Sequence, residues 1–257
     1  MVAFRGTYSI ANTIADLSTI PQEYLPYPGG NDSSTVNSRV PPRCDNCTVH
    51  SGFYNSWKNT RDVILPVLED LRLQYPNYTL TLVGHSLGGA VALLGSLDLA
   101  ARGWDPHVTT FGEPRTGNKA LTDYVDAVFD LSRTDKQGWK YHRVTHVGDP
   151  VPLLPVHEWG YRMHAGEVFI SKSGLPPTPE DLEYCDGDED PRCIMNNAEK
   201  DPESVETSRW DFLDRLKLWQ LFFAHRDYFW RLGLCVPNGD PWDWGRGKQG
   251  PLKSETR

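Results

Sequence analysis

The chain has 257 residues, of which 39% are hydrophobic and 23% are charged, a composition typical of a globular protein with a full core. Its formal net charge of −8 argues against nucleic acid as the main partner, because a polyanion would be repelled. A run of about 20 apolar residues, which a membrane-spanning helix needs, does not occur. The first residues do not resemble a signal peptide and lead almost directly into folded-looking sequence.

The early part of the chain predicts one strand and two helices. Residues 2–5 predict a strand, and residues 8–17 predict a short amphipathic helix whose apolar side carries Ile10, Ile14 and Leu17. Residues 26–48 are rich in Pro, Gly, Ser and Asn and predict a loop. Residues 53–75 predict a longer helix that ends before a proline, with one apolar face formed by Ile64, Val67, Leu68, Leu71 and Tyr75.

The middle of the chain alternates between strand and helix patterns. Helices are predicted over 90–101 and 118–129, and strands over 78–83, 108–111, 141–147 and 166–170. This alternation predicts an α/β fold, in which helices flank a mostly parallel sheet. Because no repeat or linker is evident, we expect one domain over residues 1–257, with the acidic loop near 185–203 as an insertion.

The five cysteines indicate an oxidising compartment. Four lie in two short-range pairs and one is left over: Cys44 with Cys47, Cys185 with Cys193, and Cys235. No strand precedes the first pair, as a redox motif would require, and the remaining cysteines lack the second short spacing of a zinc site. We therefore expect small structural disulfides. N-glycosylation sequons, which agree with secretion, begin at Asn31, Asn46 and Asn77.

Residues 83–90 (VGHSLGGA) lie between a predicted strand and a predicted helix. This is the setting of a nucleophile elbow, in which a serine, here Ser86, stands at the apex of a tight turn with its Oγ exposed. Gly84 and Gly88 let neighbouring backbones pass closely, and the helix N-terminus offers N–H groups where an oxyanion would form. A flexible glycine turn is the alternative, but it leaves the flanking strand and helix unexplained. We expect His85 to point away from Ser86 and to be structural.

Several segments, in this order, resemble the fungal class 3 lipases, an α/β-hydrolase family that also contains feruloyl esterases. The matching segments are residues 4–7 (FRGT), 44–54 (CDNCTVHSGFY), 84–90 (GHSLGGA), 111–118 (FGEPRTGN), 141–155 (YHRVTHVGDPVPLLP), 160–161 (GY) and 225–228 (HRDY). The resemblance implies an α/β-hydrolase fold and a serine ester hydrolase. Nothing in the sequence calls for a metal or an organic cofactor.

The resemblance also implies roles for the first residues. It places residues 4–7 in the oxyanion strand, so the backbone N–H of Thr7 joins that of Leu87 in the oxyanion hole, with the Thr7 hydroxyl as a third donor. It makes the predicted helix after Thr7, which carries Ile10, Ile14 and Leu17, the lid over the serine.

The chain departs from the family at two places. Family members carry a helix and several strands before the segment that matches residues 4–7, so we expect the first strands of the fold to be missing. A cysteine in that earlier part usually pairs with one near the C-terminus, which would leave Cys235 unpaired. Residues 196–220 are also longer than the family's usual segment before the last histidine.

A serine nucleophile needs a base and an acid that orients the base, and in α/β-hydrolases the acid follows the serine and the histidine comes last. Asp149 follows a predicted strand, and we expect it to be the acid rather than only a turn residue before proline. Of the later histidines, His157 is expected in a loop and His164 resembles a structural position. His225 has the family's H-x-x-Y-F spacing, so we predict that it is the base, with His164 as the main competitor.

The substrate is either a lipid ester or a smaller one. An apolar inner lid face favours opening at a lipid surface and so predicts an acylglycerol lipase that works at the lipid–water interface. From the cysteines and sequons we expect it to be secreted, and we expect a monomer. A feruloyl or other small-ester esterase is the alternative, because any surface helix has an apolar stripe. A truncated, inactive fragment is a third possibility, although Ser86, Asp149 and His225 are all present. Residues 209–232, dense in Trp, Phe and Leu, predict a buried C-terminal helix rather than a lipid-docking one.

Overall fold

The computed structural model of the protein describes residues 1–6, 21–25, 44–195 and 224–232. A six-stranded sheet runs through them in the order β1-β4-β5-β6-β7-β8. The first five strands in that order are parallel to one another, and β8 is antiparallel to β7. The mostly parallel sheet expected from the sequence is therefore confirmed. The strands are β1 (Val2–Phe4), β4 (Thr81–His85), β5 (His107–Phe111), β6 (Tyr141–His146), β7 (Glu167–Ile170) and β8 (Leu182–Tyr184).

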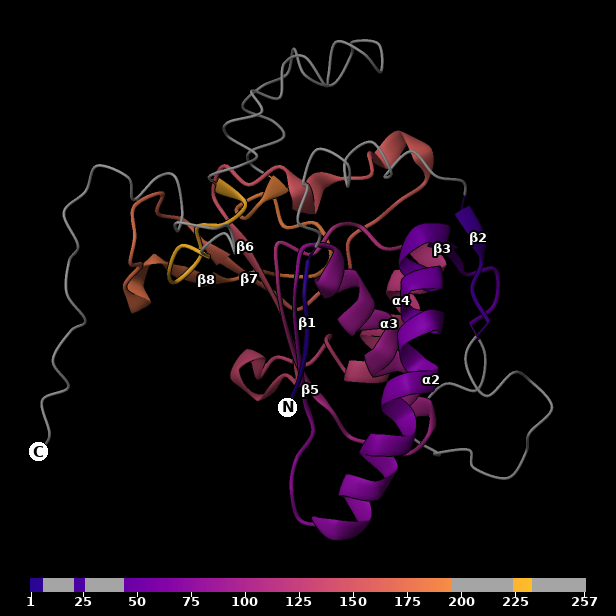
Figure 1. The fold of residues 1–257 in the computed structure, drawn as a ribbon. Helices are drawn as coiled ribbons and strands as arrows, with labels where there is room; N and C mark the ends of the chain where they lie inside the picture. The colour runs from indigo at the N-terminus through magenta and orange to yellow at the C-terminus, as the bar shows by residue number, and fades with distance from the viewer. Residues whose placement is uncertain (7–20, 26–43, 196–223, 233–257) are drawn as a thin grey trace, which may run out of the picture.

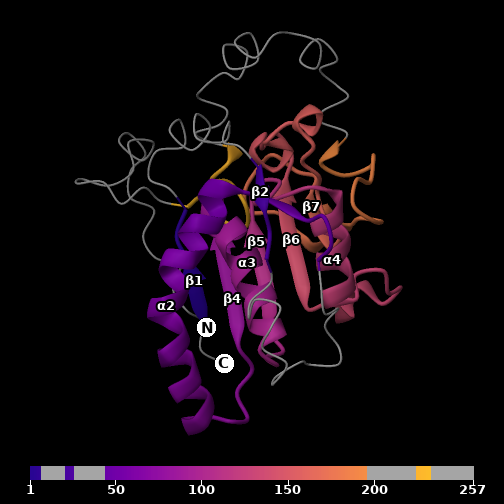
Figure 2. The same ribbon diagram turned by 90° about the vertical axis from the view of Figure 1, so that its right-hand side faces the viewer.

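In the part of the chain that the structure describes, three helices lie on one face of this sheet: α2 (Ser51–Gln74), α3 (Leu87–Ala101) and α4 (Lys119–Phe129), as Figures 1 and 2 show. Every residue of α3 from Gly88 to Ala100 is buried, because the helix packs against both the sheet and α2. None of the described helices is long and apolar enough to cross a membrane. Within the described ranges, four single 3-10 turns connect the larger elements: η1 (Lys136–Gly138), η2 (Val151–Leu153), η3 (His157–Trp159) and η4 (Pro179–Asp181).

The buried face of α2 agrees only in part with the one predicted. Of the predicted apolar residues, Leu68 is buried and Ile64 packs against the core, but Val67, Leu71 and Tyr75 are 56%, 43% and 51% exposed. The other buried side chains of the helix are Phe53, Trp57 and Leu65. The two aromatic residues decide the orientation, because they pack into the core at the start of the helix. Trp57 is held there by a hydrogen bond from its Nε1 to Asp98 Oδ2 of α3, at 2.6 Å.

A small two-stranded sheet precedes α2. It pairs β2 (Pro21–Glu23) with β3 (Thr48–His50) in antiparallel register. The sequence did not predict β2, and the predicted loop over 26–48 is wrong at Thr48, where β3 begins; residues 26–43 lie outside the described part. The Cys44–Cys47 disulfide closes the turn before β3, and Tyr24 N donates to Cys47 O across the pair at 2.9 Å.

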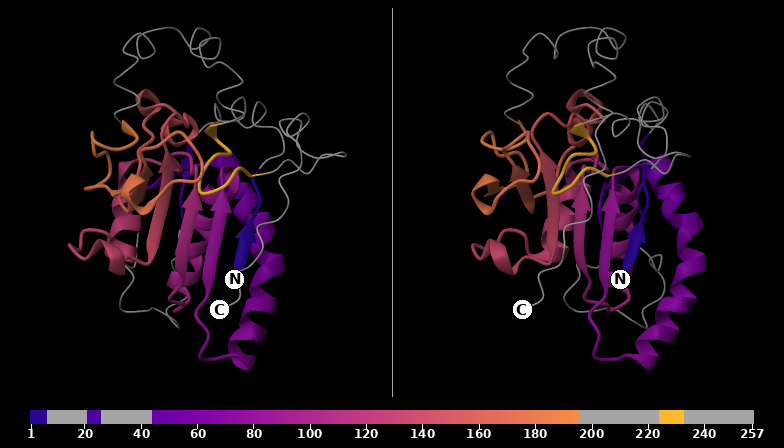
Figure 3. Two further views of the ribbon diagram at one scale, coloured as in Figure 1. Left: turned by 90° about the vertical axis from the view of Figure 1, so that its left-hand side faces the viewer. Right: turned by 60° about the vertical axis from the view of Figure 1, so that its left-hand side comes forward.

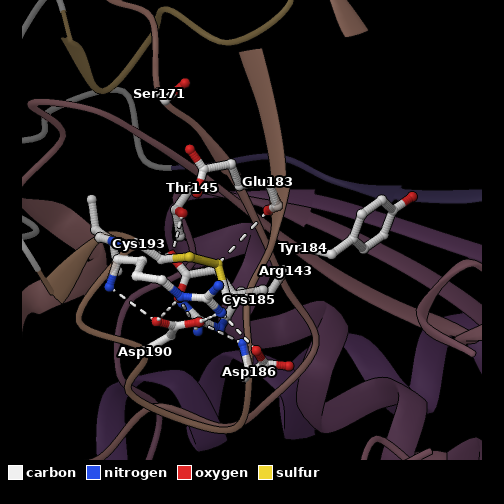
Figure 4. The surroundings of a disulfide bond; sticks show 12 residues. Arg143, Thr145, Ser171, Glu183, Tyr184, Cys185, Asp186, Asp190 and Cys193 are labelled. Atoms are coloured by element: carbon white, nitrogen blue, oxygen red, sulfur yellow. Dashed lines mark hydrogen bonds and ion pairs between the residues drawn. A yellow bond between two sulfur atoms is a disulfide. The ribbon is translucent and has the colours of Figure 1, made fainter. Parts of the chain in front are cut away.

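The second disulfide, Cys185–Cys193, closes the acidic loop beside β8 (Figure 4). Within the loop, Arg192 binds Asp186 and Asp190. Beneath it, Arg143 of β6 pairs with Glu167 of β7 at 3.2 Å, and both side chains are buried. Both short-range disulfides expected from the cysteine spacing are therefore present, and Cys235 lies outside the described residues.

Residues 224–232 cross the carboxyl ends of the parallel strands and are drawn in yellow in Figure 3. The predicted helix over 209–232 is wrong for this part, which consists of turns after residue 224. Its backbone closes on itself instead: Leu232 N donates to Arg226 O at 2.9 Å, and Asp227 bridges to Arg231. Trp230 is 65% exposed, so this part of the segment is not a buried helix face.

Candidate active site

Ser86 occupies the turn between the end of β4 and the start of α3, as the sequence predicted. Its backbone has φ 58° and ψ −131°, a conformation that costs a non-glycine residue free energy and occurs where the surrounding structure enforces it. Ser86 N donates to Phe111 O of β5 at 2.9 Å, and Ser86 O accepts from Gly89 N at 2.8 Å. The strained turn is therefore held from both the sheet and the helix.

The two glycines around Ser86 are required by close backbone approach. A Cβ on Gly84 would lie 2.1 Å from Gly88 O, and a Cβ on Gly88 would lie 2.3 Å from Phe4 O of β1. Distances this short leave no room for any side chain. The spacing of glycines that marks the elbow in the sequence thus reflects direct contact of one glycine with the other and of the turn with β1.

Asp149 and His225, which are 76 residues apart, form a buried pair. His225 Nδ1 lies 2.8 Å from Asp149 Oδ2 and 3.0 Å from Oδ1. Asp149 also accepts hydrogen bonds from Tyr228 Oη, at 2.5 Å, and from Val151 N, at 2.9 Å. An acceptor carboxylate fixes the tautomer of the imidazole, because Nδ1 must then carry the hydrogen.

The charge of Asp149 is stabilised by these contacts. Burial by itself would raise the pKa of this carboxyl, but the His225 ring and the hydrogen bonds from His225, Tyr228 and Val151 outweigh it, and the pKa is lowered. Asp149 therefore stays ionised beside the imidazole. Burial and the neighbouring carboxylate together hold the pKa of Tyr228 well above its usual value, so its hydroxyl remains a donor.

The other ring nitrogen of His225, Nε2, is buried and has no hydrogen-bond partner among the described residues. His85, the residue before Ser86, packs its ring against that of His225 with 4.5 Å between centroids. His225 is thus placed beside the end of β4, where the nucleophile turn begins. His85 was expected to point away from Ser86 and to be structural; its direct contact with the predicted base was not anticipated.

The competing histidines lie elsewhere. His164 is buried and its Nε2 contacts Glu113 Oε1 at 3.2 Å, while Tyr141 donates to the same carboxylate at 2.7 Å. Glu113 and His164 are among the residues that line a small cavity of about 10 Å³, which is room for roughly one water molecule. His157 is exposed in η3. Neither histidine is paired with Asp149.

The oxyanion and lid predictions are covered only in part by the structure. Leu87 is the first residue of α3, so its N–H stands at a helix N-terminus beside Ser86, where anions are favoured. Thr7 and the predicted lid residues Ile10, Ile14 and Leu17 lie outside the described residues. The sequence reasoning did not assign Tyr228 a role, although the H-x-x-Y spacing that it used for His225 contains this residue.

The sequence comparisons agree on one family. The family described as "Lipase (class 3)" matches residues 1–159. A protein from Gibberella zeae named "Secreted mono- and diacylglycerol lipase 2" is 54% identical over 278 residues, which cover 100% of this chain and 67% of the relative. "Lipase A" of Sodiomyces alcalophilus is 54% identical over 280 residues, covering 99% of this chain and 67% of that protein. The chain thus spans about two thirds of the length of these relatives.

The fold comparison agrees with this. A crystal structure of a lipase from Yarrowia lipolytica superimposes with a TM-score of 0.71 and 31% sequence identity, covering 90% of this chain and 71% of that one. The α/β-hydrolase fold and the family resemblance predicted from the sequence are confirmed. The chain belongs to the class 3 lipases, a family of carboxylic ester hydrolases.

Proposed function

We propose that Ser86, His225 and Asp149 are the nucleophile, base and acid of a lipase that cleaves acylglycerol esters. The observation that carries the proposal is the buried His225–Asp149 pair. The ring of His225 lies beside the end of β4, and its Nε2 has no hydrogen-bond partner among the described residues. In a serine hydrolase this is the arrangement of the base before it takes the serine proton. The strained backbone of Ser86 and its place at the N-terminus of α3 support its role as the nucleophile.

The reaction follows from these positions. Ser86 Oγ attacks the ester carbonyl carbon while His225 Nε2 accepts its proton, and Asp149 stabilises the imidazolium that forms. The carbonyl oxygen becomes an oxyanion, to which we assign the N–H of Leu87 and, outside the described residues, that of Thr7. The tetrahedral intermediate releases the alcohol, which takes the proton from His225. Water then attacks the acyl-enzyme by the same route and frees the fatty acid and Ser86.

Acylglycerols are favoured as substrates by the relatives. The 54% identical protein of Gibberella zeae is named a mono- and diacylglycerol lipase, and its similarity extends over this whole chain. A small-ester or feruloyl esterase remains the competing function, although neither of the relatives described above carries such a name. We further propose that the enzyme is a monomer acting at the lipid–water interface, with the segment around Ile10, Ile14 and Leu17 as its lid.

Secretion is supported by two independent observations. The Gibberella zeae relative is named a secreted enzyme, and the two disulfides fit an oxidising compartment. Two of the three glycosylation sequons begin at described residues, Asn46 and Asn77, and both are exposed, as glycosylation requires. Glycosylation at these two residues stays a prediction.

Hydrolysis of three substrates tests the proposal: an emulsified long-chain triacylglycerol, a diacylglycerol, and soluble methyl ferulate. Ser86→Ala, whose fold is checked by circular dichroism, is the blank. We expect turnover of the acylglycerols that rises at the emulsion limit and disappears in the variant. Turnover of the ferulate alone would instead assign a small-ester esterase, and activity retained in Ser86→Ala would overturn the assignment of the nucleophile.

A further inference from the structure

We infer that His85 is a positioning residue, which fixes the backbone of the base His225 to the nucleophile turn through a hydrogen bond from its own ring. The inference rests on the proposed roles of Ser86 and His225. It adds that the residue before the nucleophile sets the separation between nucleophile and base.

The contact itself is direct. His85 Nε2 lies 2.6 Å from His225 O, and because a carbonyl oxygen can only accept, Nε2 must carry the hydrogen. The two rings also pack against each other in a tilted arrangement, with 4.5 Å between centroids and 36° between their planes. Backbone and ring of His225 are thus both held by one side chain, which comes from the last residue of β4.

Through this contact, the position of His225 depends on the position of the nucleophile turn. His85 is covalently joined to Ser86, and its register is fixed by β4 pairing, in which His85 lies opposite Phe111 of β5. His225, in contrast, lies in a segment of turns rather than in a strand or helix. The hydrogen bond therefore joins a base that lies outside the strands and helices to the strained turn that follows β4. A shift of about 1 Å in such a base can reduce turnover by roughly 100-fold.

Other contacts complete the placement of His225. Asp149 holds its Nδ1. Gly112, with φ +57°, leaves open the space beside the ring: a Cβ there would lie 2.7 Å from His225 Cε1 and 2.6 Å from Tyr228 Oη. His85 is the contact that acts on the backbone of His225, whereas Asp149 and Gly112 act on its ring.

The chemistry of His85 suits a donor that must not compete as a base. Burial, and then the charge of His225, lower the pKa of His85 to about 4, while its hydrogen bond to His225 O and the charge of Asp149 act in the opposite direction. Arg226 also disfavours a proton on His85. The ring therefore stays neutral at the pH of catalysis, and the proton from Ser86 goes to His225.

Two substitutions separate the donor from the ring. His85→Gln keeps an N–H at a reach similar to that of Nε2, whereas His85→Leu keeps apolar bulk without a donor. His142→Leu is the matched control, because His142 is a half-buried histidine of β6 that packs on Tyr184, away from the site. The assay uses 4-nitrophenyl butyrate below its solubility limit, so that binding to a lipid surface does not enter the rates.

We expect kcat of His85→Leu to fall about 10- to 100-fold with KM within about threefold, and His85→Gln to recover most of the loss. His142→Leu should match the wild type. Unchanged kcat in His85→Leu would overturn the inference, as would a His85→Gln variant as slow as His85→Leu. Activity in Ser86→Ala would instead overturn the proposed function, which keeps the two failures distinct.

A spectroscopic measurement on the unmodified protein tests the inference without relying on the folding of the variants. In ¹⁵N-histidine NMR spectra, His85 should be the Nε2–H tautomer and remain neutral at every pH above about 5. An Nδ1–H tautomer would exclude the hydrogen bond to His225 O and overturn the inference.

Discussion

The hydroxyl of Tyr228 donates a 2.5 Å hydrogen bond to Asp149 Oδ2, the same oxygen that lies 2.8 Å from His225 Nδ1. Tyr228 is 3% exposed, and its ring packs edge-on against Phe111 and His85. The carboxylate is therefore shared between the proposed base and a buried phenol, and the phenol stabilises the charge that the base needs.

Replacing this phenol should cost stability in a pH-dependent way. In Tyr228→Phe the ring contacts remain, but Asp149 loses one donor, and a hydrogen bond to a charged group contributes about 1.5–3 kcal/mol. Because the pKa of Asp149 is lowered in the folded protein, this contribution is present at neutral pH and is lost as the pH falls through the pKa of the folded state. Urea unfolding of both proteins at several pH values measures the difference.

Tyr78→Phe is the control for that experiment, because Tyr78 is 80% exposed and its replacement should change the free energy of unfolding by less than about 0.5 kcal/mol. A loss in Tyr228→Phe that stays the same down to acid pH would show that the hydroxyl does not act on the Asp149 charge.

The strained backbone of Ser86 predicts a conflict between activity and stability. Ser86→Ala keeps the side-chain Cβ and with it the unfavourable φ of 58°, whereas Ser86→Gly removes the steric cause of the strain. We expect both variants to be inactive and Ser86→Gly to be more stable than Ser86→Ala by roughly 0.5–1 kcal/mol, after the greater chain entropy of glycine is subtracted. Thermal unfolding compares the two, and a glycine variant that is less stable would mean that the turn stores no strain.

Gly88 should tolerate no side chain. In Gly88→Ala the new Cβ would lie 2.3 Å from Phe4 O, so β1 and the start of α3 would have to separate. We expect a loss of more than about 3 kcal/mol or a failure to fold. Gly174→Ala is the matched control, because its Cβ would meet no atom closer than 3.7 Å. Expression, circular dichroism and urea unfolding of the two variants make the comparison, and equal stability would contradict the backbone contact.

Local sequence predicted the order of strands and helices because each pattern is built from neighbouring residues. The nucleophile elbow is such a pattern, since strand, glycine turn and helix are continuous in the chain. The pairing of Asp149 with His225 was also anticipated, but from the residue order and the H-x-x-Y-F spacing of a known family rather than from a local structural pattern. Which partner each histidine takes depends on how the strands are arranged, and His164 pairs with Glu113 for that reason.

The predictions failed where distant contacts decide the structure. On α2, Val67 and Leu71 have the helical spacing of the predicted apolar face but are exposed, because the packing of Trp57 against α3 rotates that face partly out of the core. The segment after residue 224 has a helix-like composition, but its turns are fixed by Asp149 and His85, which are 76 and 140 residues away from His225. Such long-range contacts leave no periodic signal in the sequence.

A carboxyl pair outside the site gives the last prediction. Asp126 of α4 contacts Asp188, which lies in the loop closed by the Cys185–Cys193 disulfide, and Asp126 Oδ1 accepts a hydrogen bond from Ala165 N at 3.0 Å. Burial raises the pKa of Asp126 from 3.8 to about 7; the charge of His164 opposes this rise, and Asp188 adds to it.

The sign of the resulting pH dependence is fixed. Between pH 4 and 7 the folded protein binds a proton on Asp126 that the unfolded chain has released, so this residue lowers the free energy of unfolding as the pH rises towards 7. In Asp126→Asn the amide is always neutral and the oxygen can still accept from Ala165 N. The variant should therefore lose stability less steeply than the wild type as the pH rises over this range, and should be the more stable of the two near pH 8.

The measurement is the free energy of unfolding in urea as a function of pH. Asp70→Asn, at an exposed position of α2, is the control and should follow the wild-type curve. Parallel curves for Asp126→Asn and the wild type would show that Asp126 titrates alike in the folded and unfolded chains.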